Sequence, residues 1–237
     1  MPSIKDHLSE VRDQLAQAAK ASGRSPSDIC LLAVSKTFPA SDVRLAYEAG
    51  QRCFGENYVQ EGIEKIIELS DLRDQIEWHF IGPLQSNKTK PVAENFDWVH
   101  SIDRLKIAQR LNEQRPKNLK PLNVCIQVNI SGEESKSGAR PDEVLDLCLA
   151  ISQMPMLRLR GLMSIPEPTE DENKQKAAHH LLSTMLETLK KDPLLVSSKA
   201  SLDTLSMGMS SDMTAAIQEG STMVRIGTAI FGKRNYL

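Results

Sequence analysis

Lys36 occupies a position in the sequence that suits a reactive amine. It ends the largely apolar run 31–35. Alternation along a strand puts Leu32, Val34 and Lys36 on one face. Burial of an ammonium is costly, so a half-buried lysine has a lowered pKa and an accessible lone pair, as a Schiff-base nucleophile requires. A lysine whose stem is buried and whose amine reaches solvent at the strand end gives the same pattern.

Arg225 is expected beside this amine. Met223, Arg225 and Gly227 alternate onto one face of the last apolar run of the chain. The last strand of a closed barrel neighbours the first, so Lys36 and Arg225 would meet at one mouth if both faces point inward. In general, an arginine at such a place is more commonly a structural ion-pair partner.

Two segments near the C-terminus have the composition of an anion site. The loop 207–212 offers a glycine, two hydroxyls and a helix start, with Ser210 or Ser211 as the expected N-cap. Gly227 and Thr228 offer backbone N–H groups that a ligand can approach closely. α/β barrels often bind phosphate with the loops after strands seven and eight and a helix N-terminus. A plain helix cap and a tight turn would have the same sequence.

The elements that position these residues alternate between short β-branched runs and longer runs of helical period. Eight strands are predicted, at residues 29–35, 52–55, 78–81, 98–101, 123–130, 158–163, 204–207 and 223–227. An opening helix is predicted over 4–18, and the clearest later helices at 61–69, 105–111, 141–152, 173–189 and 212–218.

This alternation predicts an α/β fold, a single (β/α)8 TIM barrel over residues 1–237 with an extra N-terminal helix. The length is close to the ~250 residues typical of such barrels. An open doubly wound sheet is the alternative. Its usual sign, G-x-G-x-x-G after the first strand, is absent, because that strand ends Ser35-Lys36-Thr37.

Composition excludes several classes of function. Lys plus Arg is 29 and Asp plus Glu is 31, a net charge of −2, so there is no electrostatic case for nucleic acid or a membrane surface. The N-terminus has no secretory signal, and no apolar stretch reaches the ~18 residues of a membrane span. Four widely spaced cysteines indicate reduced thiols in a cytoplasmic protein. The five histidines show no metal-ligand spacing, so no metal site is expected, and His79 is interpreted as a hydrogen-bonded core residue.

Three more loops are expected at the same mouth: 55–58, which contains Asn57, together with 131–138 and 166–171. The glycines and charges of 131–138 suit a mobile flap and a solvated loop equally.

Several motifs together resemble the pyridoxal 5′-phosphate (PLP) homeostasis protein family, whose barrel is similar to the N-terminal domain of alanine racemases. The resemblance runs from about Ile29 to the C-terminus. It rests on AVSKTFP around Lys36, FGENYVQE from Phe54, WHFIGPLQSNK from Trp78, VNISGEESKSG from Val128, RGLMSIP from Arg160 and LSMGMSSDMTAAIQEGSTMVRIGTAIFG from Leu205.

The resemblance implies a PLP-binding protein of intracellular vitamin B6 homeostasis that has no established catalytic turnover and therefore no catalytic residues. It implies a Schiff base between PLP and Lys36. The other implied cofactor-binding residues are Ser210, Gly227 and Thr228 at the phosphate, Arg225 at the pyridine nitrogen and Asn57 in the pocket wall.

An arginine at the ring nitrogen disfavours its protonation and weakens the ring as an electron sink, which suits holding PLP better than transforming amino acids. A PLP-dependent amino-acid racemase and a cofactor-free Schiff-base aldolase are the alternatives. The chain ends at Leu237, nine residues after Thr228, so the tyrosine-bearing β-domain of alanine racemases is not expected. The expected partners are PLP and apo forms of PLP-dependent enzymes, and a monomer is expected because barrel packing accounts for the apolar helix positions.

Overall fold

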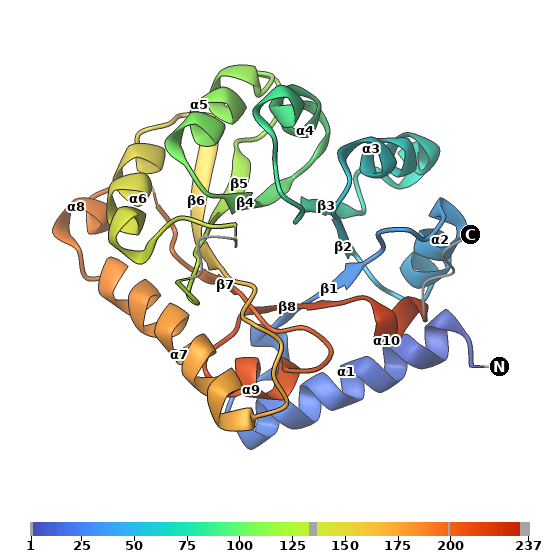
Figure 1. The fold of residues 1–237 in the computed structure, drawn as a ribbon. Coiled ribbons are helices and arrows are strands. Elements are labelled where there is room, and N and C mark those ends of the chain that lie inside the picture. Colours follow the sequence, from blue (N-terminus) through green and yellow to red (C-terminus); the bar gives the residue numbers. More distant parts are fainter. Residues whose placement is uncertain (1, 133–136, 199, 233–237) are drawn as a thin grey trace.

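Eight parallel strands close into a barrel in chain order, because β1 pairs with both β2 and β8. The computed structural model describes residues 2–132, 137–198 and 200–232 (Figure 1). The strands are β1 Cys30–Val34, β2 Cys53–Glu56, β3 Glu77–Phe80, β4 Trp98–Ile102, β5 Leu122–Gln127, β6 Leu157–Met163, β7 Thr204–Ser206 and β8 Met223–Ile226. The predicted (β/α)8 barrel is confirmed, and the open doubly wound alternative is wrong.

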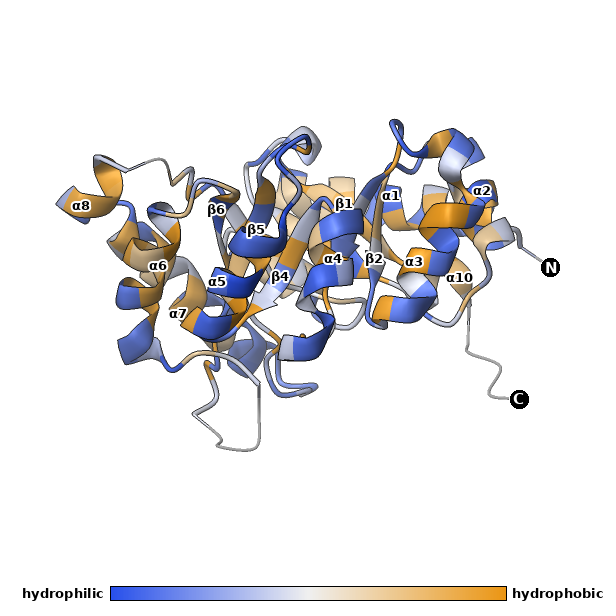
Figure 2. Ribbon diagram, turned by 90° about the horizontal axis from the view of Figure 1, so that it is seen from above, coloured by the Kyte–Doolittle hydropathy of each residue, from blue (hydrophilic) through white to orange (hydrophobic). Residues whose placement is uncertain are grey.

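Helices surround the strands (Figure 1). They are α1 Ile4–Ala21, α2 Ala40–Glu48, α3 Val59–Glu68, α4 Thr89–Asn95, α5 Leu105–Gln114, α6 Val144–Ser152, α7 Glu172–Leu189, α8 Pro193–Val196, α9 Met213–Gln218 and α10 Thr228–Phe231. Along these helices hydrophobic and hydrophilic residues are interspersed, as expected where one face packs on the sheet (Figure 2). In the described part of the chain no helix combines the length and apolar composition needed to cross a bilayer.

The extra N-terminal helix is present as α1. Ser3 caps it: the Ser3 hydroxyl accepts from the Asp6 N–H, and the Asp6 carboxylate accepts from the Ser3 N–H in return. Leu8, Val11 and Leu15 form its buried face. That face packs against α9, α10 and α2, so α1 covers the seam where β8 meets β1.

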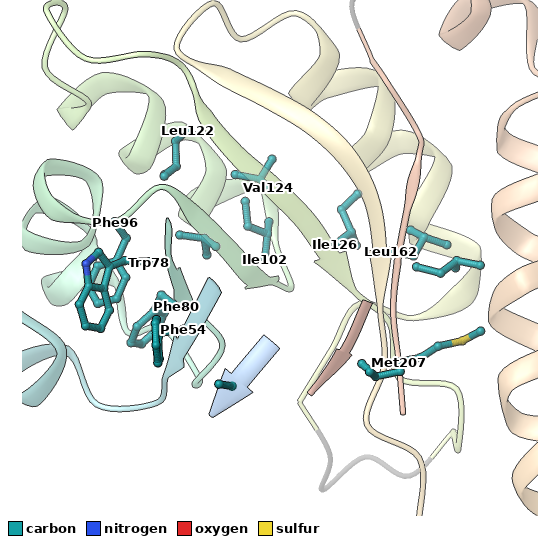
Figure 3. Packing of buried hydrophobic residues seen from close by; sticks show 14 of the residues in the cluster. Phe54, Trp78, Phe80, Phe96, Ile102, Leu122, Val124, Ile126, Leu162 and Met207 are labelled. Atoms are coloured by element: carbon teal, nitrogen blue, oxygen red, sulfur yellow. The ribbon is translucent and has the colours of Figure 1, made fainter. Parts of the chain in front are cut away.

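Side chains alternate between two cores along each strand. Leu32 and Val34 pack with Ile81 and Met223 inside the barrel, as the sequence predicted for this face of β1, whereas Ala33 joins the outer cluster under the helices. In that outer cluster Phe54, Trp78, Phe80 and Phe96 lie together (Figure 3). The barrel interior is therefore filled, and ligands can enter only at its ends.

Candidate functional site

A cavity of about 310 Å³ opens at the C-terminal end of the barrel. The six residues predicted from the sequence all line it: Lys36, Asn57, Ser210, Arg225, Gly227 and Thr228. Val34, Phe38, Ile81 and Ile165 add apolar wall. Two of the larger hollows, of about 660 and 570 Å³, lie around the strand starts at the other end of the barrel, and none of these six residues lines them.

The backbone around Lys36 has an unusual conformation. β1 ends at Val34, and Thr37, directly after Lys36, has φ +68°. A β-branched residue rarely adopts this left-handed conformation and keeps it only where its surroundings enforce it. Here the Thr37 N–H donates to Glu61 Oε1 at 2.5 Å, which fixes the turn that carries Lys36 into the cavity.

A buried cation, Lys65 on α3, supports the same turn. Its Nζ donates to the carbonyl of Ser35 at 2.7 Å, to Glu56 Oε1 at 2.8 Å and to Glu61 Oε1 at 2.6 Å. The Ser35 hydroxyl also donates to Glu56 Oε1, at 2.6 Å. Burial raises the pKa of Glu56, although Lys65 and Ser35 oppose that rise. Sequence reasoning missed this network; the only signal for it was the i,i+4 spacing of Glu61 and Lys65.

Arg225 lies at the base of the cavity with 4% of its surface exposed. Its guanidinium donates to the Ser206 carbonyl at 2.5 Å, the Ser206 hydroxyl at 2.9 Å and the Ser164 carbonyl at 2.8 Å. Burial lowers its pKa to about 10, against the opposing effect of Asp212, so it remains a cation at neutral pH. Among the described residues no carboxylate lies within ion-pair distance of it, so the structural ion-pair interpretation finds no support there.

The loop after β7 differs in one respect from the prediction. The helix α9 begins at Met213 with Asp212 at the N-cap, so neither Ser210 nor Ser211 is the cap residue. The Asp212 carboxylate turns back into the loop, where it accepts from the Met209 N–H at 2.6 Å and contacts His179 Nε2 at 3.0 Å. Burial raises the pKa of Asp212, but the two hydrogen bonds, from His179 and Met209, together outweigh burial and hold that pKa below its usual value. Ser210 and Ser211 are thereby left in the cavity wall.

Gly227 closes the other side of this wall. A Cβ atom there would meet the Val34 carbonyl at 3.1 Å, so the chain passes close over the end of β1. The short helix α10 starts directly after it, at Thr228, and was not predicted from the sequence. Asn57, on the far side, has a buried Oδ1 with no hydrogen-bond partner in the described part of the chain. A buried unpaired acceptor suggests a ligand that donates to it.

Inside the barrel a hydrogen-bonded chain runs from the strand starts to Arg225. His79 Nε2 contacts Glu77 Oε1 at 3.0 Å and His79 Nδ1 contacts His100 Nε2 at 2.9 Å. His100 Nδ1 contacts the Ser206 hydroxyl at 2.8 Å, and Arg225 donates to the same hydroxyl. His79 is therefore the hydrogen-bonded core residue that was predicted. Burial, then the nearby His79 and Arg225 charges, hold the pKa of His100 well below its usual value.

Residues 7–235 match the family described as alanine racemase, N-terminal domain. Over 236 residues the chain is 56% identical to a pyridoxal phosphate homeostasis protein of Pseudomonas aeruginosa, covering 100% of this chain and 98% of that protein. It is 55% identical to the Escherichia coli K12 protein of that name, covering 100% and 99%. The chain belongs to the pyridoxal phosphate homeostasis protein family. The resemblance seen in its motifs is confirmed.

Solved structures agree with this membership of the pyridoxal phosphate homeostasis protein family. PipY of Synechococcus elongatus, in its PLP-bound structure, has a TM-score of 0.83 at 36% identity and covers 97% of this chain and 100% of that one. Alanine racemase from Corynebacterium glutamicum has a TM-score of 0.68 at 16% identity, with 97% of this chain and 62% of that one covered. The likeness to the racemase shows the fold alone.

Proposed function

We propose that this chain holds PLP covalently on Lys36 and serves intracellular PLP homeostasis as a carrier, without catalytic turnover. One observation carries the proposal: a single cavity contains a lysine amine, a buried arginine and the two hydroxyl- and glycine-bearing segments of an anion site. Relatives more than half identical over the full chain are named for PLP homeostasis, and PipY has been solved with PLP bound.

The cavity residues fit PLP by their chemistry. When bound, PLP supplies an aldehyde that bonds to an amine, a ring that accepts electrons and a phosphate dianion. Lys36 provides the amine, while Ser210, Gly227 and Thr228 provide donors for the phosphate. The buried Asn57 Oδ1, unpaired in the described part of the chain, would be available to a donor group of the ligand.

Arg225 favours holding the cofactor over using it. Its guanidinium keeps its positive charge in the buried site and is fixed by oxygens of Ser206 and Ser164. A fixed cation beside the pyridine nitrogen opposes protonation there, and the ring is then a poor electron sink.

The wider setting follows from the same proposal. We expect apo PLP-dependent enzymes to receive the cofactor. We also expect the protein to act as a monomer folded as one domain, because α1 covers the seam between β8 and β1. All four cysteines are free thiols, which agrees with a cytoplasmic location.

A vitamer titration tests the phosphate end of the site. PLP should bind at least about 100-fold more tightly than pyridoxal, because two charge-assisted hydrogen bonds at ~1.5 kcal/mol or more each are lost with the phosphate. Ser210→Ala should weaken binding of PLP and leave pyridoxal unaffected, whereas Ser70→Ala, at an exposed serine, should change neither. Equal affinities of the wild type for the two vitamers would refute this phosphate site.

Replacement of Arg225 tests the charge beside the ring. Arg225→Glu should shift the visible absorption of the bound cofactor and its pH dependence, because a carboxylate favours the protonated ring. Arg225→Lys keeps the positive charge and should keep the wild-type spectrum. An unchanged spectrum in a folded, PLP-loaded Arg225→Glu protein would show that this residue does not face the ring.

A further inference from the structure

Three side chains of metal-binding type meet inside the barrel at its N-terminal end, opposite the cofactor cavity. The Sγ of Cys53, a carboxylate oxygen of Glu77 and a ring nitrogen of His79 all lie within 4.8 Å of one another. Glu77 Oε1 is 3.0 Å from His79 Nε2 and 3.8 Å from Cys53 Sγ. None of these residues lines the cavity that holds Lys36.

Strand register brings the three together. Cys53 and Glu77 are direct partners across the parallel pair β2 and β3, so their side chains point to the same face of the sheet. His79 is two residues after Glu77 on β3 and points the same way. Because 24 residues separate Cys53 from Glu77, the sequence shows no metal-ligand spacing. The expectation of no metal site rested on that spacing and not on the register between β2 and β3.

The donor set suits zinc. Thiolate sulfur, imidazole nitrogen and carboxylate oxygen are the ligands that Zn²⁺ takes, at roughly 2.0–2.3 Å each. Tetrahedral bonds of that length place ligand atoms about 3.3–3.8 Å apart. Two of the three separations, 3.0 and 3.8 Å, agree with this range to within a small side-chain adjustment, and the third, between Cys53 and His79, is at most 4.8 Å.

A second residue already orients the imidazole. A zinc-bound histidine usually donates its other ring N–H to a neighbour, which fixes its tautomer. His79 Nδ1 lies 2.9 Å from His100 Nε2, and His100 is itself held by the Ser206 hydroxyl. With His79 Nδ1–H donating to His100, the lone pair of Nε2 points toward Glu77, where the metal would sit.

An ion can reach this place from solvent. The hollow of about 660 Å³ at this end of the barrel is lined by both Cys53 and Glu77. Arg160 is a nearby cation, but its guanidinium is paired with Asp203 at 2.8 Å and stacked on Trp98. Binding of Zn²⁺ would release the proton of the Cys53 thiol, and the resulting thiolate and the Glu77 carboxylate would supply two negative charges, which balance a divalent ion.

We propose that Cys53, Glu77 and His79 bind one Zn²⁺ at the N-terminal end of the barrel, with water from the hollow as the fourth ligand. Three protein ligands and a water is an established arrangement for zinc. The site is separate from the proposed PLP cavity, so either proposal can fail without the other.

Zinc sulfate titration of the full-length, PLP-loaded protein tests the site. A reductant is kept present because the thiol of Cys30 contacts that of Cys53 and could otherwise form a disulfide with it. Competition with a chelating indicator should give one zinc per chain. Cys53→Ala and Glu77→Gln should each lower the zinc affinity by roughly 10–100-fold or more. A loss of that size is typical when a residue that only hydrogen-bonds to a metal ligand is replaced, and a ligand itself should matter at least as much. Cys148→Ala, at a buried thiol of α6, and His180→Ala, at an exposed histidine, should leave it unchanged.

Cobalt substitution of the wild type gives a readout that does not depend on how the variants fold. Co²⁺ should show the intense red-visible bands of a tetrahedral thiolate site, beyond the absorption of the cofactor, and added zinc should remove them. A weak octahedral spectrum would overturn the proposal. Zinc affinity unchanged in both Cys53→Ala and Glu77→Gln would overturn it equally.

Discussion

Loaded with PLP, the chain is expected not to racemise L-alanine at an enzymatic rate. Racemisation removes the α-proton from one face of the bound amino acid and returns a proton to the other, so it needs two positioned acid–base groups. Lys36 can serve one face. The tyrosines are the candidates for the other, and each missing acid–base group typically costs ~10²–10⁴ in rate.

Of the tyrosines that the structure describes, neither Tyr47 nor Tyr58 is positioned to act as the second acid–base group. Tyr47 lies on α2, and its hydroxyl donates to Gln75 rather than reaching the cavity. Tyr58, which follows Asn57, is 55% exposed and does not line the cavity. Tyr236 lies outside the described residues.

The measurement is deuterium exchange at the α-carbon of L-alanine, with chiral analysis of the product. Exchange and racemisation should stay far below a kcat of about 1 s⁻¹, the lower end of ordinary enzymes. Turnover at or above that rate would contradict the carrier proposal. If that turnover disappeared in Tyr58→Phe, Tyr58 would be the second acid–base group and the racemase alternative would be correct.

Lys65→Met is expected to destabilise the protein by about 3–5 kcal/mol, the usual cost of removing one partner from a buried ion pair. The variant keeps the side-chain length but removes the charged donor from two buried acceptors. Among the described residues, Glu56 then keeps only the Ser35 hydroxyl as a donor, and the Ser35 carbonyl keeps only the Phe38 N–H. Such a loss is a large share of the ~5–15 kcal/mol that holds most domains folded.

Urea unfolding monitored by circular dichroism measures this change. The loss in unfolding free energy is read from the shift of the midpoint urea concentration, provided that the dependence of that free energy on urea is unchanged. Lys90→Met is the matched control, because Lys90 pairs with Glu94 across an exposed helix turn at 3.8 Å, and such pairs contribute about 0.3–0.5 kcal/mol. A loss in Lys65→Met no larger than in the control would show that the buried cation does not stabilise the turn at Lys36.

The cavity could be predicted because strand alternation is a local rule and the pairing of the first strand with the last follows from the barrel fold. Val34 and Met223 point inward by period two, and the pairing of β1 with β8 then brings Lys36 and Arg225 to one mouth. The motifs added Asn57, and the loops after β7 and β8 added the anion-binding segments.

The supporting contacts could not be predicted because they depend on register and side-chain direction between distant segments. Lys65 reaches back 30 residues to Ser35. Asp212, and not Ser210 or Ser211, is the N-cap residue of α9, and its carboxylate turns to Met209 and His179. The loop 131–138 stays an open prediction, since residues 133–136 lie outside the described residues.

Borohydride reduction of the PLP-loaded protein, followed by peptide mass spectrometry, tests the central proposal most directly. Reduction makes the bond between the cofactor and its amine permanent, so the modified peptide identifies the residue. We predict one phosphopyridoxyl group, on Lys36, and a Lys36→Ala protein that remains folded and is colourless. A phosphopyridoxyl group on another lysine, with Lys36→Ala still fully yellow, would contradict the assignment of PLP to Lys36.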